Sequence, residues 1–292
     1  MKISPNTLTL APWSATKQKT ATTCPFRAYH LFVEKTKEVF DTPVSTSAMV
    51  VGIKIHSLME LILTKYPDEF PELSTLNDLG TKIMEESIIA DGKDLSMSEI
   101  DHIYSLFEGT VNMCQRILSH KHKTNSIGFT EVPVAIDEDF NPTDFKDNKS
   151  LYRGKIDYLL LHPTGAAAVI DAKTGAWPHL NSHLPQLRAY EVLTLFALSE
   201  KFKQEHKISL NSILSGLAYV ATEQLLWDKK QTVDKITIEK NNLINNLNIV
   251  ADRVFNKEIK RGNHCNSCGF KHLCGSRRGK GKKKKDSGTT CL

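Results

Sequence analysis

The sequence predicts an α/β (α+β) fold in which helices surround a central mixed sheet. Three observations lead to this prediction. Residues 24–120 carry apolar side chains at helical spacing, and residues 129–172 contain short β-type runs separated by turns. A further helix, strand and helix then lead into a cysteine-rich end. The predicted order is a helical region, an α-β-β-β-α-β core, and a terminal helix followed by a metal-binding segment.

The helical region divides into four predicted helices, at residues 24–39, 47–65, 78–89 and 98–120. In the last of them an apolar stripe continues to Cys114, which is therefore expected in the core. Strands are predicted around residues 129–133 and at 152–161 and 166–172, and the turn signal His162-Pro163-Thr164-Gly165 separates the last two. The helix 184–201, the strand 213–221 and the helix 237–255 complete the series.

Length and composition favour a soluble intracellular protein. With 292 residues and 40% apolar residues, the chain can bury a large core. It contains no uninterrupted apolar run of about 18 residues and begins without the apolar stretch of a secretory signal. We therefore expect a cytoplasmic location, reduced thiols and no membrane partner. The expected organisation is a polar segment at 1–20, one domain at 21–275 with a helical insertion at about 70–120, and a basic tail at 276–292.

The net charge of +5 comes from that tail. Residues 276–292 hold seven Lys and Arg residues and one acid, so the rest of the chain has 31 basic and 32 acidic residues. The tail has nothing apolar to bury and is expected to be disordered. It can bind phosphates without sequence preference, act as an import signal, or only increase solubility.

Two acids and a lysine are candidates for catalysis. Asp157 lies within a strand rich in Leu and Ile, and Asp171 ends a strand of Ala, Val and Ile. A carboxylate in such a place is costly unless it is paired or bound to a cation. Two oxygen ligands from neighbouring strands suit Mg²⁺ or Mn²⁺. Lys173 shares the face of Asp171, where it can position or deprotonate an attacking water. A plain Asp–Lys ion pair is the alternative for Asp171 and Lys173 alone.

The series Gly-Lys-Ile-Asp157, Asp171-Ala-Lys173 and Gln186-x-x-x-Tyr190 resembles the RecB-like branch of the PD-(D/E)XK nuclease superfamily, over about residues 20–275. The resemblance implies a restriction-endonuclease-like core and hydrolysis of DNA phosphodiester bonds. It also implies that His56, in Gly52-x-x-x-His56, binds metal, and that Glu131 is the acid of the first core strand. Further implied are a metal contact from the carbonyl of Ala172, and roles for Gln186 and Tyr190 in orienting the site or contacting DNA.

A cysteine group near the C-terminus suggests a second metal centre. Cys265, Cys268 and Cys274 supply three thiols within ten residues. His264 and His272 flank them, so a local Cys₃His zinc site is one interpretation. RecB-like nucleases with an iron–sulfur cluster, such as the AddB-type and CRISPR-associated exonucleases, take a fourth cysteine from upstream, and Cys24 resembles it. The resemblance thus implies a structural 4Fe–4S cluster joining the two ends of the chain.

The sequence therefore leads to the hypothesis of a Mg²⁺- or Mn²⁺-dependent deoxyribonuclease, an exonuclease favouring single-stranded ends. DNA is the expected partner, with protein partners in recombination or CRISPR adaptation; phage DNA metabolism is another setting for this chemistry. Two alternatives stay open: a non-catalytic nucleic-acid-binding or assembly subunit on the same fold, and a zinc-knuckle nucleic-acid-binding protein.

Overall fold

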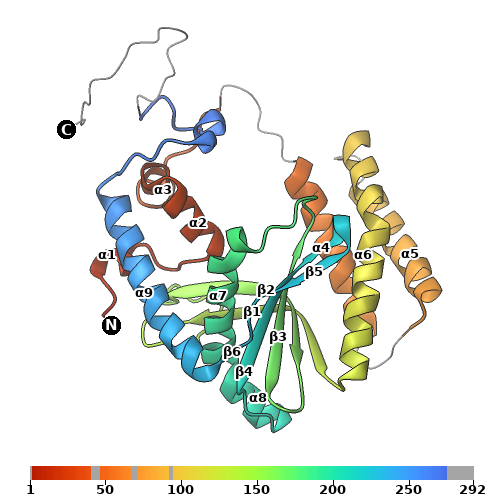
Figure 1. Cartoon of the computed structure of the whole chain (residues 1–292). Helices are drawn as coiled ribbons and strands as arrows, with labels where there is room; N and C mark the ends of the chain where they lie inside the picture. Colours follow the sequence, from red (N-terminus) through yellow and green to blue (C-terminus); the bar gives the residue numbers. More distant parts are fainter. Residues whose placement is uncertain (1, 41–46, 67–70, 92–94, 275–292) are drawn as a thin grey trace.

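The computed structural model describes residues 2–40, 47–66, 71–91 and 95–274. Its centre is a mixed sheet with the strand order β1-β2-β3-β4-β5, in which β6 pairs with β4 (Figure 1). β1 is antiparallel to β2 and β2 to β3, while β3 and β4 are parallel. The bounds are β1 (Ile127–Ile136), β2 (Tyr152–Leu161), β3 (Ala166–Lys173), β4 (Ser212–Tyr219), β5 (Gln224–Trp227) and β6 (Gln231–Thr232). This architecture confirms the predicted fold class.

The sheet is covered on both faces, and β2 shows why its sequence is almost continuously apolar. Leu159 and Leu161 enter one buried cluster, whereas Tyr158 and Leu160 enter the cluster on the opposite face. Successive side chains of a strand point to opposite faces, so a strand covered twice needs apolar residues at consecutive positions. The carboxylate of Asp157 is the exception within this run.

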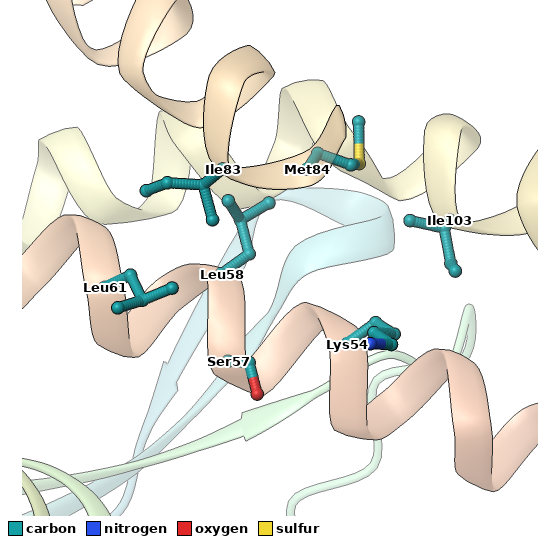
Figure 2. A pocket seen from close by; sticks show the side chains of 7 residues that line it. All are labelled: Lys54, Ser57, Leu58, Leu61, Ile83, Met84 and Ile103. Atoms are coloured by element: carbon teal, nitrogen blue, oxygen red, sulfur yellow. The ribbon is translucent and has the colours of Figure 1, made fainter. Parts of the chain in front are cut away.

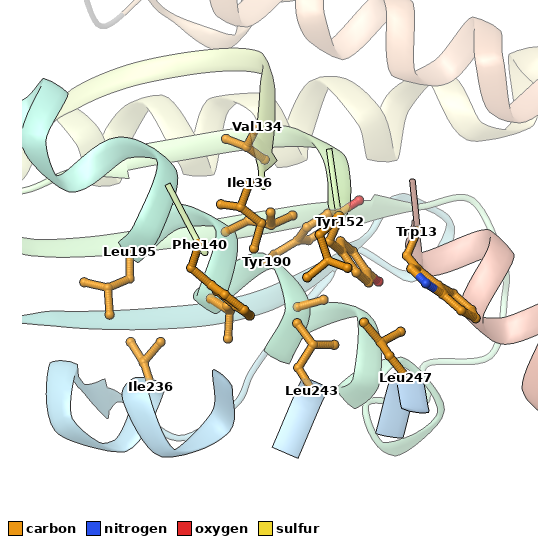
Figure 3. Close-up of a cluster of buried hydrophobic side chains, with 14 of the residues drawn as sticks. Trp13, Val134, Ile136, Phe140, Tyr152, Tyr190, Leu195, Ile236, Leu243 and Leu247 are labelled. Atoms are coloured by element: carbon orange, nitrogen blue, oxygen red, sulfur yellow. The ribbon is translucent and has the colours of Figure 1, made fainter. Parts of the chain in front are cut away.

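One face carries α7 (Leu184–Leu193), α8 (Ser199–His206) and α9 (Val233–Phe255) together with three helices from the start of the chain. Figure 3 shows part of this core, where Trp13, Tyr152, Tyr190 and Leu243 lie close together. Residues about 230 positions apart in sequence thus share one apolar cluster. Their burial holds the two ends of the described chain against the same face of the sheet.

The N-terminal segment belongs to this core. It forms α1 (Pro5–Thr9), α2 (Ala15–Thr23) and α3 (Pro25–Phe32). Trp13 is fully buried, its Nε1–H donates to the carbonyl of Thr7, and its backbone N–H donates to Leu151 over 2.8 Å. This differs from the expectation that residues 1–20 form a separate polar segment. Two large apolar residues, Leu10 and Trp13, anchor the segment, and two residues three positions apart produce no extended periodic pattern.

The opposite face carries α4 (Ser47–Lys65), α5 (Leu73–Asp91) and α6 (Met97–Lys123). Figure 2 shows a pocket between these helices, with Leu58, Leu61, Ile83, Met84 and Ile103 in its wall. Its lining includes one lysine and one serine but no carboxylate or imidazole. The pocket therefore offers no ligands for hard-metal chemistry, and the acids of the sequence motif lie elsewhere.

By length and composition, α4 is the one helix among the described residues that is apolar enough to cross a membrane. In this structure it packs against α5, α6 and β1, and Ile55 and Ile62 are fully buried. A core helix of a globular domain passes the same test, and α4 is such a helix here.

Some element boundaries differ from the sequence predictions. The predicted helix 184–201 is interrupted by a π-helical turn at Thr194–Leu198, after which α8 continues to His206. The predicted helix 24–39 ends at Phe32, followed by Lys35 in the left-handed region with φ 54°. β5 and β6 were not predicted, because strands of four and two residues give almost no alternation signal.

Candidate active site

Three elements bring ligand-type side chains together at one place. His56 extends from α4, Glu131 from β1 and Asp157 from β2. One ligand atom of each residue lies within 4.8 Å of the other two. His56 Nδ1 lies 3.4 Å from Asp157 Oδ1. The structure therefore gathers three of the residues that the sequence proposed as metal ligands.

This group has the dimensions of a cation site. Ligand atoms on opposite sides of a Mg²⁺ ion, each about 2.1 Å from it, are about 4.2 Å apart. All three side chains are partly exposed, which leaves room for water and substrate in the remaining coordination positions. Two carboxylates and one imidazole can bind Mg²⁺. They suit Mn²⁺ better, because imidazole is a poor ligand for Mg²⁺, the harder of the two ions.

The backbone is distorted where the two acids face each other. β1 and β2 pair at Thr130 with Tyr158 and at Val132 with Ile156, but the intervening Glu131 and Asp157 are not a ladder pair. Glu131 has φ 50°, in the left-handed region. Such a conformation costs a non-glycine residue about 1–3 kcal/mol and is concentrated at functional sites. The distortion coincides with the point where both carboxylates reach one ion position.

The two carboxylate oxygens of Asp157 have different partners. Its Oδ2 accepts the backbone N–H of Ala172 on β3 over 2.7 Å, while Oδ1 faces His56. The hydrogen bond fixes the carboxylate across the β2–β3 junction and leaves one oxygen for a cation. Glu131 is held from the other side by an ion pair with Lys155. The ligand group is thus positioned by neighbouring groups before any ion binds.

Asp171 lies beside this group but is not part of it. It is 3% exposed, Lys173 forms an ion pair with its Oδ2, and Gln186 Nε2 donates to its Oδ1 over 2.8 Å. Burial raises the pKa of Asp171 to about 6, although the charge of Lys173 opposes the shift. Metal ligation by Asp171 and by the carbonyl of Ala172 therefore stays a prediction.

Gln186 and Tyr190 share one face of α7, as their spacing of four predicts. Gln186 Nε2 also donates to the hydroxyl of Tyr190 over 3.2 Å, and Tyr190 is 6% exposed. The pair contacts Asp171, which favours the orienting role over direct contact with DNA. Gly154 permits this packing, because a Cβ there would lie 2.8 Å from the Tyr190 ring.

Asp157 and Asp171 also affect the pKa of His56. Burial pulls the pKa of His56 down, but the hydrogen bond to Asp157 and the charges of Asp157 and Asp171 outweigh it and raise the pKa. A protonated imidazole cannot bind a metal, so cation binding at this group must displace the proton. Because the pKa of His56 is raised, protonation of its imidazole competes with cation binding, and the competition strengthens as pH falls.

The sequence analysis missed one ligand-type residue. Glu60 lines the same pocket as His56, Glu131 and Asp157. It lies four residues after His56 on α4, so the two share a helix face. The four-residue spacing between His56 and Glu60 is the sequence feature that could have identified Glu60 as a candidate ligand. From its sequence position alone, Arg188 on the same helix as Gln186 is a weaker candidate for contact with the DNA backbone, but in the structure it is paired with acids of the protein. Its guanidinium binds the fully buried Glu191 at 2.8 and 3.0 Å.

The two ends of the chain meet, as the cysteine pattern suggests. Phe26 N–H donates to Glu258, and Val39 N–H donates to Gly269, both over 3.0 Å. Among the described residues, however, only the His56, Glu131 and Asp157 group has three ligand atoms within 4.8 Å. Cys24, Cys265, Cys268 and Cys274 form no disulfide within the described ranges, and their sulfur atoms are not gathered in this way. The geometry thus supports neither the 4Fe–4S cluster nor the local zinc site.

The sequence matches the family profile described as the PD-(D/E)XK nuclease superfamily over residues 12–275. The chain belongs to this superfamily. No curated protein matches it. Among solved structures, that of SSO0001 is 16% identical, covers 79% of this chain and 98% of its own, and has a TM-score of 0.31. A TM-score this low is too weak to show a shared fold.

Membership in the PD-(D/E)XK nuclease superfamily agrees with the mixed sheet and its flanking helices. Proteins of the superfamily are generally metal-dependent nucleases, so a nucleic acid is the substrate class that the family indicates. Asp157 lies in the middle of β2, and Asp171 and Lys173 lie at the end of the neighbouring β3.

Proposed function

We propose that this PD-(D/E)XK protein is a Mg²⁺- or Mn²⁺-dependent DNA nuclease that degrades single-stranded ends. One observation carries the proposal: His56, Glu131 and Asp157 converge within 4.8 Å beside the paired Asp171 and Lys173. A hard cation held by two carboxylates next to a fixed ammonium group is the arrangement that phosphodiester hydrolysis requires.

A bound cation would polarise the scissile phosphate and lower the pKa of its bound water. The chain's own groups have separate tasks. Asp157, Glu131 and His56 would hold the cation, and Lys173 would direct the attacking water and offset negative charge as it develops on the phosphate. Gln186 fixes the Asp171 carboxylate, and through it the position of Lys173.

The proposal is tested by incubating linear and circular single-stranded DNA with the purified protein. Linear DNA labelled at either end should be shortened in Mn²⁺ or Mg²⁺, and EDTA should stop cleavage completely. Circular single strands should resist, because an exonuclease requires an end. Cleavage of the circle would identify an endonuclease. Retained DNA binding without any cleavage in Mn²⁺ would instead indicate a non-catalytic subunit.

The preference for unpaired DNA is supported by Trp177, which lies four residues after Lys173. It is 81% exposed, more than any other large apolar residue in the described ranges. An exposed indole in the segment that leaves the strand of Asp171 and Lys173 can stack on an unpaired base, and such stacking contributes about 1–3 kcal/mol per base. A paired base is already stacked and gains less.

We therefore expect Trp177→Ala to raise the KM for single-stranded DNA about thirtyfold, which corresponds to the middle of that range, while kcat changes little. Trp177→Phe retains an aromatic face and should recover most of the loss. Steady-state kinetics with an oligothymidine substrate make the comparison. Identical KM values for the wild type and both variants would show that Trp177 does not contact the substrate.

The RecB-like branch and the iron–sulfur cluster stay predictions that rest on the resemblance of the cysteine and nuclease motifs. The sulfur geometry adds no support for the cluster. Iron and acid-labile sulfide analysis of anaerobically purified protein decides the matter, and a Cys24→Ser variant provides the control.

A further inference from the structure

A groove of about 630 Å³ has Lys173 and Gln186 in its lining, and both of these residues contact Asp171 of the site. Side chains from α2, α7 and α9 form its walls, together with the turn that precedes α7. The pocket of the His56 group and this groove share no lining residue. Lys173 and Gln186 therefore stand at the entrance where the groove meets the active site.

The polar groups that line the groove are basic or neutral. Its lining contains Lys19, Lys173 and His183, several hydroxyl and amide groups, and no carboxylate. This absence of carboxylates is notable because acids outnumber bases by 32 to 31 in the chain outside residues 276–292. A wall of ammonium, imidazole and hydroxyl donors without carboxylates suits a phosphodiester backbone.

The charged groups act on one another across the groove. Burial lowers the pKa of His183, and the charges of Lys173 and Lys19 lower it further. His183 thus lies within the field of both lysines. Lys19 is exposed on α2, and no ion pair joins it to an acid within the described ranges. An anion entering the groove would be attracted by the ammonium groups of Lys19 and Lys173.

We infer that the groove between α2 and α7 binds the sugar–phosphate backbone of one unpaired strand next to the scissile phosphate, with Lys19 contacting a phosphate. This inference rests on the proposed nuclease function and extends it to a binding surface. The volume lies in the range of enclosed ligand sites, about 300–1,000 Å³. It suits a single strand, whereas a duplex would have to separate before entering.

The inference is tested by the salt dependence of DNA binding. An Asp157→Asn background without divalent ions prevents cleavage, and fluorescence anisotropy with labelled oligothymidine gives Kd at several salt concentrations. Lys19→Gln should weaken binding roughly threefold to tenfold and reduce the slope of log K against log salt by about 0.7, the value for one phosphate contact of a single strand. Thr22→Glu, which places a carboxylate in the wall, should weaken binding further.

Lys201→Gln is the matched control, because Lys201 is likewise an exposed helical lysine but lies on α8, far from α2 in Figure 1. Its affinity and slope should equal those of the parent. If Lys19→Gln and Thr22→Glu both match this control while wild-type protein cleaves DNA, the groove inference is wrong and the nuclease function stands. If wild-type protein neither binds nor cleaves single strands, the function itself fails.

Discussion

Replacing Asp157 by Asn is expected to abolish metal-dependent cleavage and leave the fold intact. Asn keeps a carbonyl oxygen that can accept the Ala172 N–H, so the β2–β3 junction is retained. It removes the charge that makes Oδ1 a cation ligand beside His56 and Glu131. Loss of a metal's contribution costs several kcal/mol of transition-state stabilisation, so cleavage should fall roughly 10³-fold.

Single-turnover cleavage of an end-labelled single strand in Mn²⁺ measures this effect, and thermal unfolding shows that the variant is folded. Manganese binding, followed by electron paramagnetic resonance, should weaken in parallel. Asp101→Asn, at an exposed position on α6, is the control and should cleave normally. Undiminished cleavage by Asp157→Asn would mean that the His56 group is not the catalytic centre.

Replacing Lys173 by Met is expected to cause a loss of similar size for a different reason. Methionine keeps the length and apolar stem of the side chain but removes the ammonium group that pairs with Asp171. The attacking water then loses its partner, and the negative charge on the phosphate is no longer offset. Cleavage should fall by roughly 10²–10³-fold, as for removal of other charge-stabilising groups. Equal rates for the variant and the wild type would exclude a catalytic role for Lys173.

The same variant should change the pH dependence of stability. Burial already raises the pKa of Asp171 to about 6, and loss of Lys173 removes the charge that opposes this shift. A carboxyl group with a raised pKa binds its proton more tightly in the folded state, so its contribution to stability decreases as pH rises. In wild-type protein the decrease should end near pH 6, whereas in Lys173→Met it should continue above that pH. Melting temperatures measured without metal from pH 5 to 8 provide the comparison.

Much of the central region could be predicted from sequence because its signals are local. The predicted strand at 152–161 has the bounds of β2, and the predicted helix at 47–65 has those of α4. The continuous apolar pattern of β2 made Asp157 conspicuous, and the spacing of Gln186 and Tyr190 placed both on one helix face. In this region the hydrophobic periodicity and one carboxylate within an apolar strand were sufficient to predict the elements and to select Asp157 as a candidate site residue.

Other features depend on contacts between distant residues and left no local pattern. Trp13 anchors the N-terminal segment through a backbone bond to Leu151, and neither residue signals the other. The conformation of Glu131 is set by its position opposite Asp157, where strand pairing is interrupted. Arg188 is occupied by a buried acid that comes three residues later, although an exposed contact with DNA had fitted the same sequence.

The packing of α9 has a consequence for the order in which the protein is made. Asn246 and Val250 of this helix line the groove that has Lys173 in its lining, and Leu243 shares a core with Trp13. During synthesis the residues around the His56 group leave the ribosome long before α9 does. A nascent chain would therefore carry the proposed catalytic residues before it has the α9 wall of the groove. A chain truncated before α9 would keep the His56 group and lack that wall.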